Sequence, residues 1–388
     1  MISHSSFRSH WSIDPAITFL NHGSFGACPI AVQQEQQAWR DRLERDPMRF
    51  FVWDYEELLD RSREAMAAFV EADAADLVFV PNATAGVNAV LRSLHVRPGD
   101  ELLTTSHEYN ASRNALDFVA AQAGAIVTVA ELPFPIESAD QVIEFVLAKV
   151  TDKTRLLLID HVTSQTGLVL PIEPIISKLS AAGIATLVDG AHAPGMLPLN
   201  LKKLGATYYT GNAHKWLCAP KSAAFLVVDR AQQSQIRPLA ISHGANSLRQ
   251  DRSRFQLEFD WTGTADPSAV FSIPKAIEYL GSLLPGGWPE LMQHNRNLAI
   301  AARHLLCDAL KISPPCPAAM LGAMAAIPLP DGDCELLYRQ LVDRAIQVQL
   351  QAWPRSPKRI LRISAQLYNQ LADYECLATA LQILHQSY

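Results

Sequence analysis

Short apolar runs recur along the first two-thirds of the chain, separated by longer stretches in which apolar residues have helical spacing. Each run is continuous and lacks the polar alternation of a half-exposed strand. Such runs are typical of strands covered on both faces, as in a mostly parallel sheet between helices. The expected strands are 77–80, 101–105, 125–129, 155–159, 185–188, 208–209 and 224–228.

The pattern changes after about residue 264, where longer helical patterns alternate with fewer strands. Helices are expected at 274–284, 291–310, 334–345 and 372–385, and strands at 323–329 and 359–363. We therefore predict an α/β protein with a large domain over 31–270 and a smaller C-terminal α+β domain over 271–388. Residues 1–30 are expected to pack with either domain.

Composition places the 388-residue chain among ordinary globular proteins, since 49% of its residues are apolar and 19% are charged. The net charge of −6 disfavours a nucleic-acid partner. The six cysteines form no C-x-x-C pair, so no metal site is predicted, and their sparse use fits a reducing cytoplasm. No apolar run is long enough to span a membrane, and the first 14 residues lack the apolar core of a signal peptide. We expect a cytoplasmic protein without a membrane partner.

An aspartate and a lysine in the second half of the predicted sheet indicate a catalytic site. Asp189 ends the apolar run 184–188, and Lys215 follows His214 in a small, glycine-bearing turn. Enzymes that use pyridoxal 5'-phosphate (PLP) need a lysine that forms a Schiff base and an acid that holds the pyridine nitrogen. Apolar neighbours predict partial burial of Lys215, which lowers a lysine pKa as this role requires. The alternatives are a solvated loop lysine and an aspartate that caps a turn.

Two further features accompany this pair. His192, three residues after Asp189, would lie near the cofactor ring, although a structural loop histidine is an equal alternative. Residues 82–86 follow a strand and open a helix, where free N–H groups and the helix dipole attract a phosphate. A plain helix cap by Asn82 or Thr84 is the alternative.

Several segments, in this order, resemble class V aminotransferase-like, fold-type-I PLP enzymes. The segments are 82–86, 107–111, 160–164, 189–192, 211–216 and 263–264. Within that family the chain is similar to the isopenicillin N epimerase-like subgroup, to which 19–26 and 361–369 also correspond. The resemblance covers nearly the whole chain. It implies a fold-type-I PLP-dependent transferase, whose large domain holds a sheet of the seven-stranded type, and a homodimer with shared active sites.

The resemblance also implies catalytic and substrate-binding roles. Lys215 would carry the cofactor and act as base and acid at the substrate Cα, with Asp189 on the pyridine nitrogen and His192 beside the ring. Arg362 would clamp the substrate α-carboxylate, because a guanidinium fork matches a carboxylate. Without the resemblance, Arg362 is an ordinary strand arginine. Asn21 and His22 are expected to line the substrate pocket.

The implied cofactor-binding set is larger. Tyr109 would stack on the ring, Ser164 would contact the phenolic oxygen, and Thr264 would reach the phosphate of the other subunit. The full set is Ala83, Thr84, Tyr109, Ser164, Asp189, His192, Asn212, His214, Lys215 and Thr264.

The sequence predicts one cofactor but leaves several reactions open. We expect loss of the Cα proton from an amino acid or aminoacyl substrate, provisionally as an epimerase or racemase. A C–S lyase acting on a cysteine-type substrate is the first alternative, a class V aminotransferase the second, and a catalytically silent PLP-binding protein the non-enzyme alternative. Cys316 and Cys334 do not match the cysteine loop of cysteine desulfurases and are expected to be structural.

Overall fold

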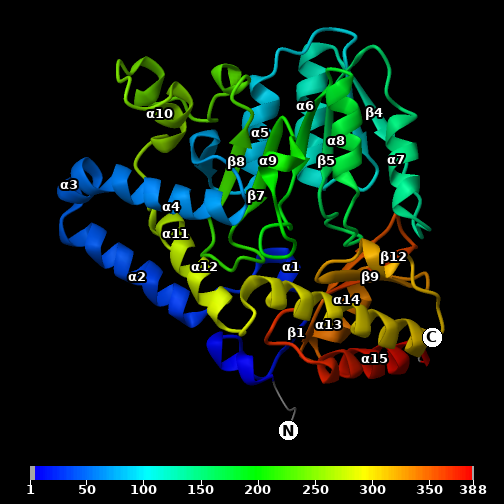
Figure 1. The fold of residues 1–388 in the computed structure, drawn as a ribbon. Helices are drawn as coiled ribbons and strands as arrows, with labels where there is room; N and C mark the ends of the chain where they lie inside the picture. The colour runs from blue at the N-terminus through cyan, green and yellow to red at the C-terminus, as the bar shows by residue number, and fades with distance from the viewer. Residues whose placement is uncertain (1–4, 387–388) are drawn as a thin grey trace.

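A seven-stranded sheet forms the centre of the larger part of the computed structural model, which describes residues 5–386 (Figure 1). Its strand order is β2-β8-β7-β6-β5-β3-β4. Strand β8 is antiparallel to both of its neighbours, and the other neighbouring pairs are parallel, so the predicted mostly parallel sheet is confirmed. The strands are β2 (Leu77–Val80), β3 (Glu101–Thr105), β4 (Ile126–Ala130), β5 (Thr154–Asp160), β6 (Ala185–Asp189), β7 (Tyr208–Asn212) and β8 (Ala224–Val228).

Burial on both faces explains why these strands have continuous apolar sequences. In β5, Leu156 and Leu158 enter the core on one face, while Leu157 and Ile159 enter the core on the other. Successive side chains of a strand point to opposite faces, so both sets must be apolar. Helices α5, α6 and α10 cover the first face, and α4 and α8 contribute to the core on the second.

The helices of this part of the chain connect and cover the strands (Figure 1). They are α1 (His22–Phe25), α2 (Ile30–Arg45), α3 (Pro47–Arg49), α4 (Tyr55–Phe69), α5 (Ala83–Ser93), α6 (Asn110–Ala123), α7 (Ala139–Leu147), α8 (Ile172–Ala181), α9 (Leu201–Leu204), α10 (Arg254–Asp260), α11 (Ser268–Phe271) and α12 (Ile273–Ser282). Short helical turns are η1 (Ser6–His10), the π-helical η2 (Phe50–Asp54), η3 (Ala74–Asp76), η4 (Gln233–Gln235), η5 (His243–Asn246) and η6 (Ala318–Met320).

The C-terminal part is built on a small antiparallel sheet of order β11-β12-β9, against which α13 packs, with α15 against α13. Its elements are α13 (Gly287–Leu310), β9 (Met324–Leu329), α14 (Cys334–Val342), β10 (Ile346–Gln347), β11 (Gln349–Ala352), β12 (Arg359–Ser364) and α15 (Leu371–Gln386). The arrangement agrees with the smaller α+β unit expected from sequence. The division at residue 270 stays a prediction, because α12 packs against α2 and α4.

The N-terminal segment joins the C-terminal part through a short parallel strand pair. Strand β1 (Thr18–Phe19) pairs with β10, and the backbone N–H of Ser364 donates to the carbonyl of Leu20 over 2.9 Å. This pairing places α1 next to strand β12. Among residues 5–386, no helix is both long and apolar enough to cross a bilayer.

Candidate functional site

The carboxyl ends of the parallel strands meet at one edge of the large sheet, where open α/β sheets bind ligands. Asp160 at the end of β5 lies in register with Asp189 at the end of β6, and Asp189 in turn faces Thr210 of β7. The turn that carries Lys215 follows β7 directly. The fold therefore brings the predicted aspartate and lysine to the same edge.

The amine of Lys215 is hydrogen-bonded to a histidine whose tautomer is fixed by its neighbour. Nε2 of His192 lies 3.1 Å from Nζ of Lys215, and the indole N–H of Trp216 donates to Nδ1 of His192 over 3.4 Å. An indole N–H only donates, so Nδ1 accepts and the proton of the neutral ring is on Nε2. In this arrangement, Nε2–H donates to Nζ, which requires the uncharged amine.

The surroundings of Lys215 favour that uncharged form. Burial and the nearby Arg362 guanidinium, opposed by Asp189 and Asp160, together lower its pKa to about 8. Burial, followed by the charges of Lys215 and Arg362, also holds the pKa of His192 well below its usual range. At neutral pH the ring is therefore uncharged, and about a tenth of the lysine is uncharged and free to act as a nucleophile.

Asp189 is 2% exposed and has a hydrogen bond to each carboxylate oxygen. The Ser112 hydroxyl donates to Oδ2 over 2.8 Å, and the Ala191 N–H donates to Oδ1 over 3.0 Å. Burial raises its pKa, while these two donors and Lys215 lower it. A Cβ on the adjacent Gly190 would lie 2.3 Å from the ring of Tyr209, so a glycine is required here.

The N-terminal segment closes over the lysine turn from the opposite side. The ring of His22 is fully buried between the hydroxyl of Tyr368 (2.8 Å from Nδ1) and the carbonyl of Lys215 (3.0 Å from Nε2). Gly26 has φ +70°, and a Cβ there would lie 2.2 Å from the carbonyl oxygen of His214. The buried ring of His22 thus holds the lysine turn, and its expected pocket-lining role stays a prediction.

Arg362 is buried at this edge and is held by two separate segments of the chain. Its guanidinium donates to the carbonyl of Ser164, to Oδ1 of Asn21 over 3.2 Å and to Oγ of Ser24 over 3.1 Å. Burial lowers its pKa to about 10, so it remains charged at neutral pH. Within the described residues, the buried Nε has no hydrogen-bond partner, which leaves one donor for a bound group.

The start of α5 lies beside the end of β7. The N–H of Ala83 donates to Oδ1 of Asn212 over 2.9 Å, and Asn82 caps the helix through the N–H of Ala85. Burial lowers the pKa of His214 to about 4, and its Nδ1 lies 3.0 Å from the carbonyl of Ala223. These residues are adjacent, as expected, and their role toward a phosphate stays a prediction.

Tyr109 and Thr264 are the most exposed members of the predicted set. Tyr109 precedes α6 and is 41% exposed, close enough to Arg362 to affect its pKa. Thr264 is exposed in the loop between α10 and α11, where it lines a 650 Å³ hollow together with Met48 and Val52. The structure gives Thr264 no contact with the lysine site, so its predicted role depends on a second subunit.

Four polar residues of the site were not among those predicted from sequence. Glu108 and Asp160 are buried beside Asp189, Ser112 binds Asp189, and Ser24 binds Arg362. A signal was present for the two acids, since each lies at or just after the end of an apolar strand, as Asp189 does.

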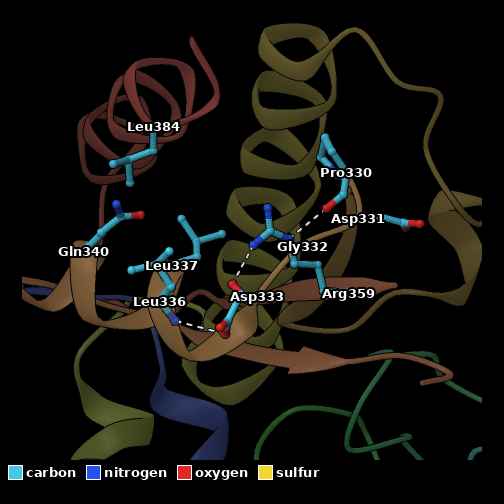
Figure 2. Close-up of a pocket in the computed structure, with 9 residues that line it drawn as sticks. All are labelled: Pro330, Asp331, Gly332, Asp333, Leu336, Leu337, Gln340, Arg359 and Leu384. Atoms are coloured by element: carbon cyan, nitrogen blue, oxygen red, sulfur yellow. Dashed lines mark hydrogen bonds between the residues drawn. The ribbon is translucent and has the colours of Figure 1, made fainter. Parts of the chain in front are cut away.

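A second hollow, of about 290 Å³, lies in the C-terminal part and is shown in Figure 2. Its Arg359 donates to the backbone carbonyls of Pro330 and Asp333, as the dashed lines show. None of the predicted site residues lines it. The arginine has a structural role there, joining β12 to the start of α14.

Comparison with known proteins agrees with this arrangement. The family model described as "Aminotransferase class-V" matches residues 31–376. Isopenicillin N epimerase from Amycolatopsis lactamdurans is 34% identical over 97% of this chain and 97% of its own length. A probable chloroplastic L-cysteine desulfhydrase from Arabidopsis thaliana is 28% identical over 98% of this chain and 86% of its own length.

Solved structures with low sequence identity share the fold. A C-DES lysine-to-alanine mutant with glycine covalently linked to the PLP cofactor superposes with a TM-score of 0.82 at 20% identity, covering 97% of this chain and 98% of that one. The cysteine desulfurase CsdA from Escherichia coli superposes with a TM-score of 0.78 at 20% identity, covering 98% of both chains. These likenesses confirm the predicted fold.

Proposed function

We propose that this chain, which belongs to the aminotransferase class-V family, is a PLP-dependent enzyme that removes the Cα proton of an amino acid or aminoacyl substrate and acts as an epimerase. The observation that carries the proposal is the hydrogen bond between Lys215 and His192, at an edge that also holds Asp189 and Arg362. A buried amine that is readily uncharged, a carboxylate and a carboxylate-binding guanidinium are the groups this reaction needs.

The residues present fit the cofactor. Lys215 offers an amine with a lowered pKa, Asp189 offers a buried carboxylate for a ring nitrogen, and the first turn of α5 offers N–H groups for a phosphate. When bound, PLP supplies an electron sink that stabilises negative charge at the substrate Cα. The tight packing of Gly26 and Gly190 leaves the backbone around the lysine little freedom to move.

Different side chains position the substrate and transfer its proton. Arg362 binds the substrate carboxylate and orients the Cα, because its guanidinium is fixed by Asn21, Ser24 and Ser164. Lys215 takes the Cα proton at Nζ, since burial keeps its pKa near neutrality, and inversion requires that a second donor deliver a proton to the opposite face of Cα. His192 orients Nζ through Nε2.

Deuterium exchange tests the reaction. Candidate amino acids are incubated in deuterated water with the PLP-loaded enzyme, and exchange at Cα with inversion of configuration is expected. Borohydride should lock the cofactor onto Lys215. Lys215→Ala should abolish exchange, and Lys202→Ala, which removes an exposed lysine of α9, should not. Exchange retained in Lys215→Ala, or a protein that stays colourless with PLP, would overturn the proposal.

A C–S lyase is the second candidate, favoured by the similarity to the L-cysteine desulfhydrase of Arabidopsis thaliana. It shares the first step with the epimerase and differs in expelling a sulfur group from Cβ. The same incubation separates the two reactions, because a lyase acting on cysteine releases pyruvate and sulfide without accumulating the inverted amino acid.

The proposal includes a homodimer. Met48, Val52, Trp53 and Leu248 are exposed by 61–94%, and Met48 and Val52 line the same hollow as Thr264. An exposed apolar group of this kind is typical of a protein interface. Light scattering should give twice the chain mass, and Thr264→Ala should weaken PLP binding in the dimer; a PLP-loaded monomer would contradict this part of the proposal.

A further inference from the structure

Three carboxyl groups meet at the edge of the large sheet, on different strands. Glu108 follows β3, Asp160 ends β5 and Asp189 ends β6, and one oxygen of each lies within 4.8 Å of the others. Their exposed fractions are 5%, 2% and 2%. Three adjacent carboxylates that are shielded from water cannot all carry a charge without a large free-energy cost.

Hydrogen bonds distinguish Asp189 from the other two acids. Both of its oxygens accept good hydrogen bonds, from Ser112 and from Ala191. Glu108 receives a side-chain hydrogen bond only from Thr104, at 3.5 Å. Within the described part of the chain, Oε1 of Glu108 and Oδ2 of Asp160 have no hydrogen-bond partner. The missing donor for these two oxygens is explained if one acid carries a proton.

The surrounding charges also affect how readily each of the three acids ionises. Burial raises the pKa of Glu108 and of Asp160, and the Asp189 charge raises both further. The positive charge of Lys215 favours ionisation of Asp160 and Asp189, and the backbone N–H of Tyr109 favours ionisation of Glu108 and Asp160. His161 and Tyr209, two further titratable side chains at this edge, are hydrogen-bonded to each other over 2.9 Å.

We propose that Glu108 and Asp160 hold one proton between them, and therefore one negative charge, so that Asp189 stays ionised toward the ring nitrogen of the cofactor. The inference rests on the proposed function. In this role the two acids are positioning residues: they set the charge beside Lys215 and Asp189 without touching the substrate. A pair with two charges would push a proton onto Asp189, and a pair with none would leave Lys215 with less negative charge nearby.

Replacing each acid by its amide tests how many negative charges Glu108 and Asp160 carry together. Glu108→Gln leaves Asp160 as the single anion, and Asp160→Asn leaves Glu108 as the single anion. Each single variant therefore preserves the proposed charge, and only the double variant removes it. The nitrogen of Lys215 senses this charge, because a nearby anion raises the pKa of a cationic group.

The experiment is a pH titration of the visible absorption band of the PLP-loaded enzyme. Each single variant should keep the midpoint within about 0.3 pH units of the unsubstituted enzyme, and the double variant should lower it by about one unit. A shift of that size in either single variant would mean that both acids were ionised. An unchanged midpoint in the double variant would mean that the pair carried no charge. Either result overturns the proposal.

Infrared spectroscopy provides a second readout that does not depend on the cofactor. The unsubstituted protein at neutral pH should have the carbonyl stretch of a protonated carboxylic acid, and Glu108→Gln and Asp160→Asn should each remove it. Glu131→Gln, at an exposed acid just after β4, should retain it. Absence of the band from the unsubstituted protein would refute proton sharing. Failure to acquire a visible band with PLP would instead refute the proposed function, while the infrared result still decides the protonation of the pair.

Discussion

The imidazole of His192 meets Nζ of Lys215 at 3.1 Å through Nε2, the nitrogen that carries its proton. The donor on the far side of the ring, Trp216, determines this polarity. An indole buried in the core thus controls the protonation state of the lysine at the surface of the site, because a donating Nε2–H stabilises the amine and not the ammonium ion.

Trp216→Phe should slow capture of PLP in a pH-dependent manner. Losing the indole N–H frees the histidine tautomer, and the loss of a hydrogen bond worth about 1 kcal/mol raises the pKa of Lys215 by less than one unit. Stopped-flow absorbance should therefore give a rate about fivefold lower at pH 7 and an unchanged rate at pH 10. Trp288→Phe removes an indole hydrogen bond to Ile277 far from the lysine and serves as the control. Equal slowing at both pH values would indicate a packing effect.

Arg362→Lys should raise the KM for the amino acid by about 10–100-fold while kcat changes by only a few fold. A lysine keeps the charge and loses the fork that binds a carboxylate bidentately, and charge-assisted hydrogen bonds are worth roughly 1.5–3 kcal/mol each. Steady-state kinetics measures the two parameters. Arg359→Lys, on the same strand β12, should leave KM unchanged, because Arg359 holds only backbone carbonyls. A lower kcat at constant KM would contradict a substrate-binding role.

Gly26→Ala should destabilise the protein more than Gly99→Ala. Both glycines have positive φ, +70° and +83°, so both alanines incur a backbone strain of about 1–2 kcal/mol. Only at Gly26 does the added Cβ also meet backbone atoms, at 2.2 Å from the carbonyl of His214, whereas Gly99 has nothing within 4 Å. Urea denaturation should give a loss in unfolding free energy of about 3 kcal/mol or more for Gly26→Ala. Equal losses of unfolding free energy in the two variants would mean that the N-terminal segment does not pack tightly against the lysine turn.

His22→Asn should reduce the acid sensitivity of the fold. Burial lowers the pKa of His22 to about 3, against about 6.5 in the unfolded chain, so the unfolded state binds the additional proton. The stability that neutral His22 supplies is present above pH 6.5 and is lost as the pH falls toward 3. Between pH 7 and pH 5 this histidine alone accounts for a loss of about 2 kcal/mol.

Denaturation at pH 7 and at pH 5 measures how much unfolding free energy the protein loses between these pH values. This loss should be smaller by about 2 kcal/mol in His22→Asn than in the unsubstituted protein, whatever the variant's stability at pH 7. The exposed His95→Asn is the control and should leave the difference unchanged. An unaltered difference in His22→Asn would mean that the ring titrates normally in the folded protein.

The large sheet was predictable because its strands are buried on both faces. The runs 77–80, 101–105 and 224–228 were placed with the bounds of β2, β3 and β8. Strand β11 was not predicted, since Gln349 and Gln351 alternate with apolar residues on a half-exposed edge and give no continuous run. Strands β1 and β10 are two residues long and exist only because each pairs with the other.

Local sequence patterns predicted the candidate site only where a residue lies at or just after the end of a predicted strand. Asp189 ends β6 and Lys215 follows β7, so the parallel sheet brings them to one edge. The contact between Asn21 and Arg362 joins residues 341 positions apart, and no local pattern encodes it. Glu108 lies three positions after the end of β3, so its sequence position alone does not place its side chain at the end of the strand. Its burial beside Asp160 depends on how the loop after β3 folds.

The strand pair β1–β10 has a consequence for biosynthesis. A ribosome releases Thr18 and Phe19 long before Ile346 and Gln347, so strand β1 has no pairing partner while the large sheet forms. Lys215 and the residues that hold the Arg362 guanidinium are already made by then, but Arg362 itself is still missing. The pocket is therefore completed only after Arg362 has left the ribosome, when the large sheet has already been synthesised.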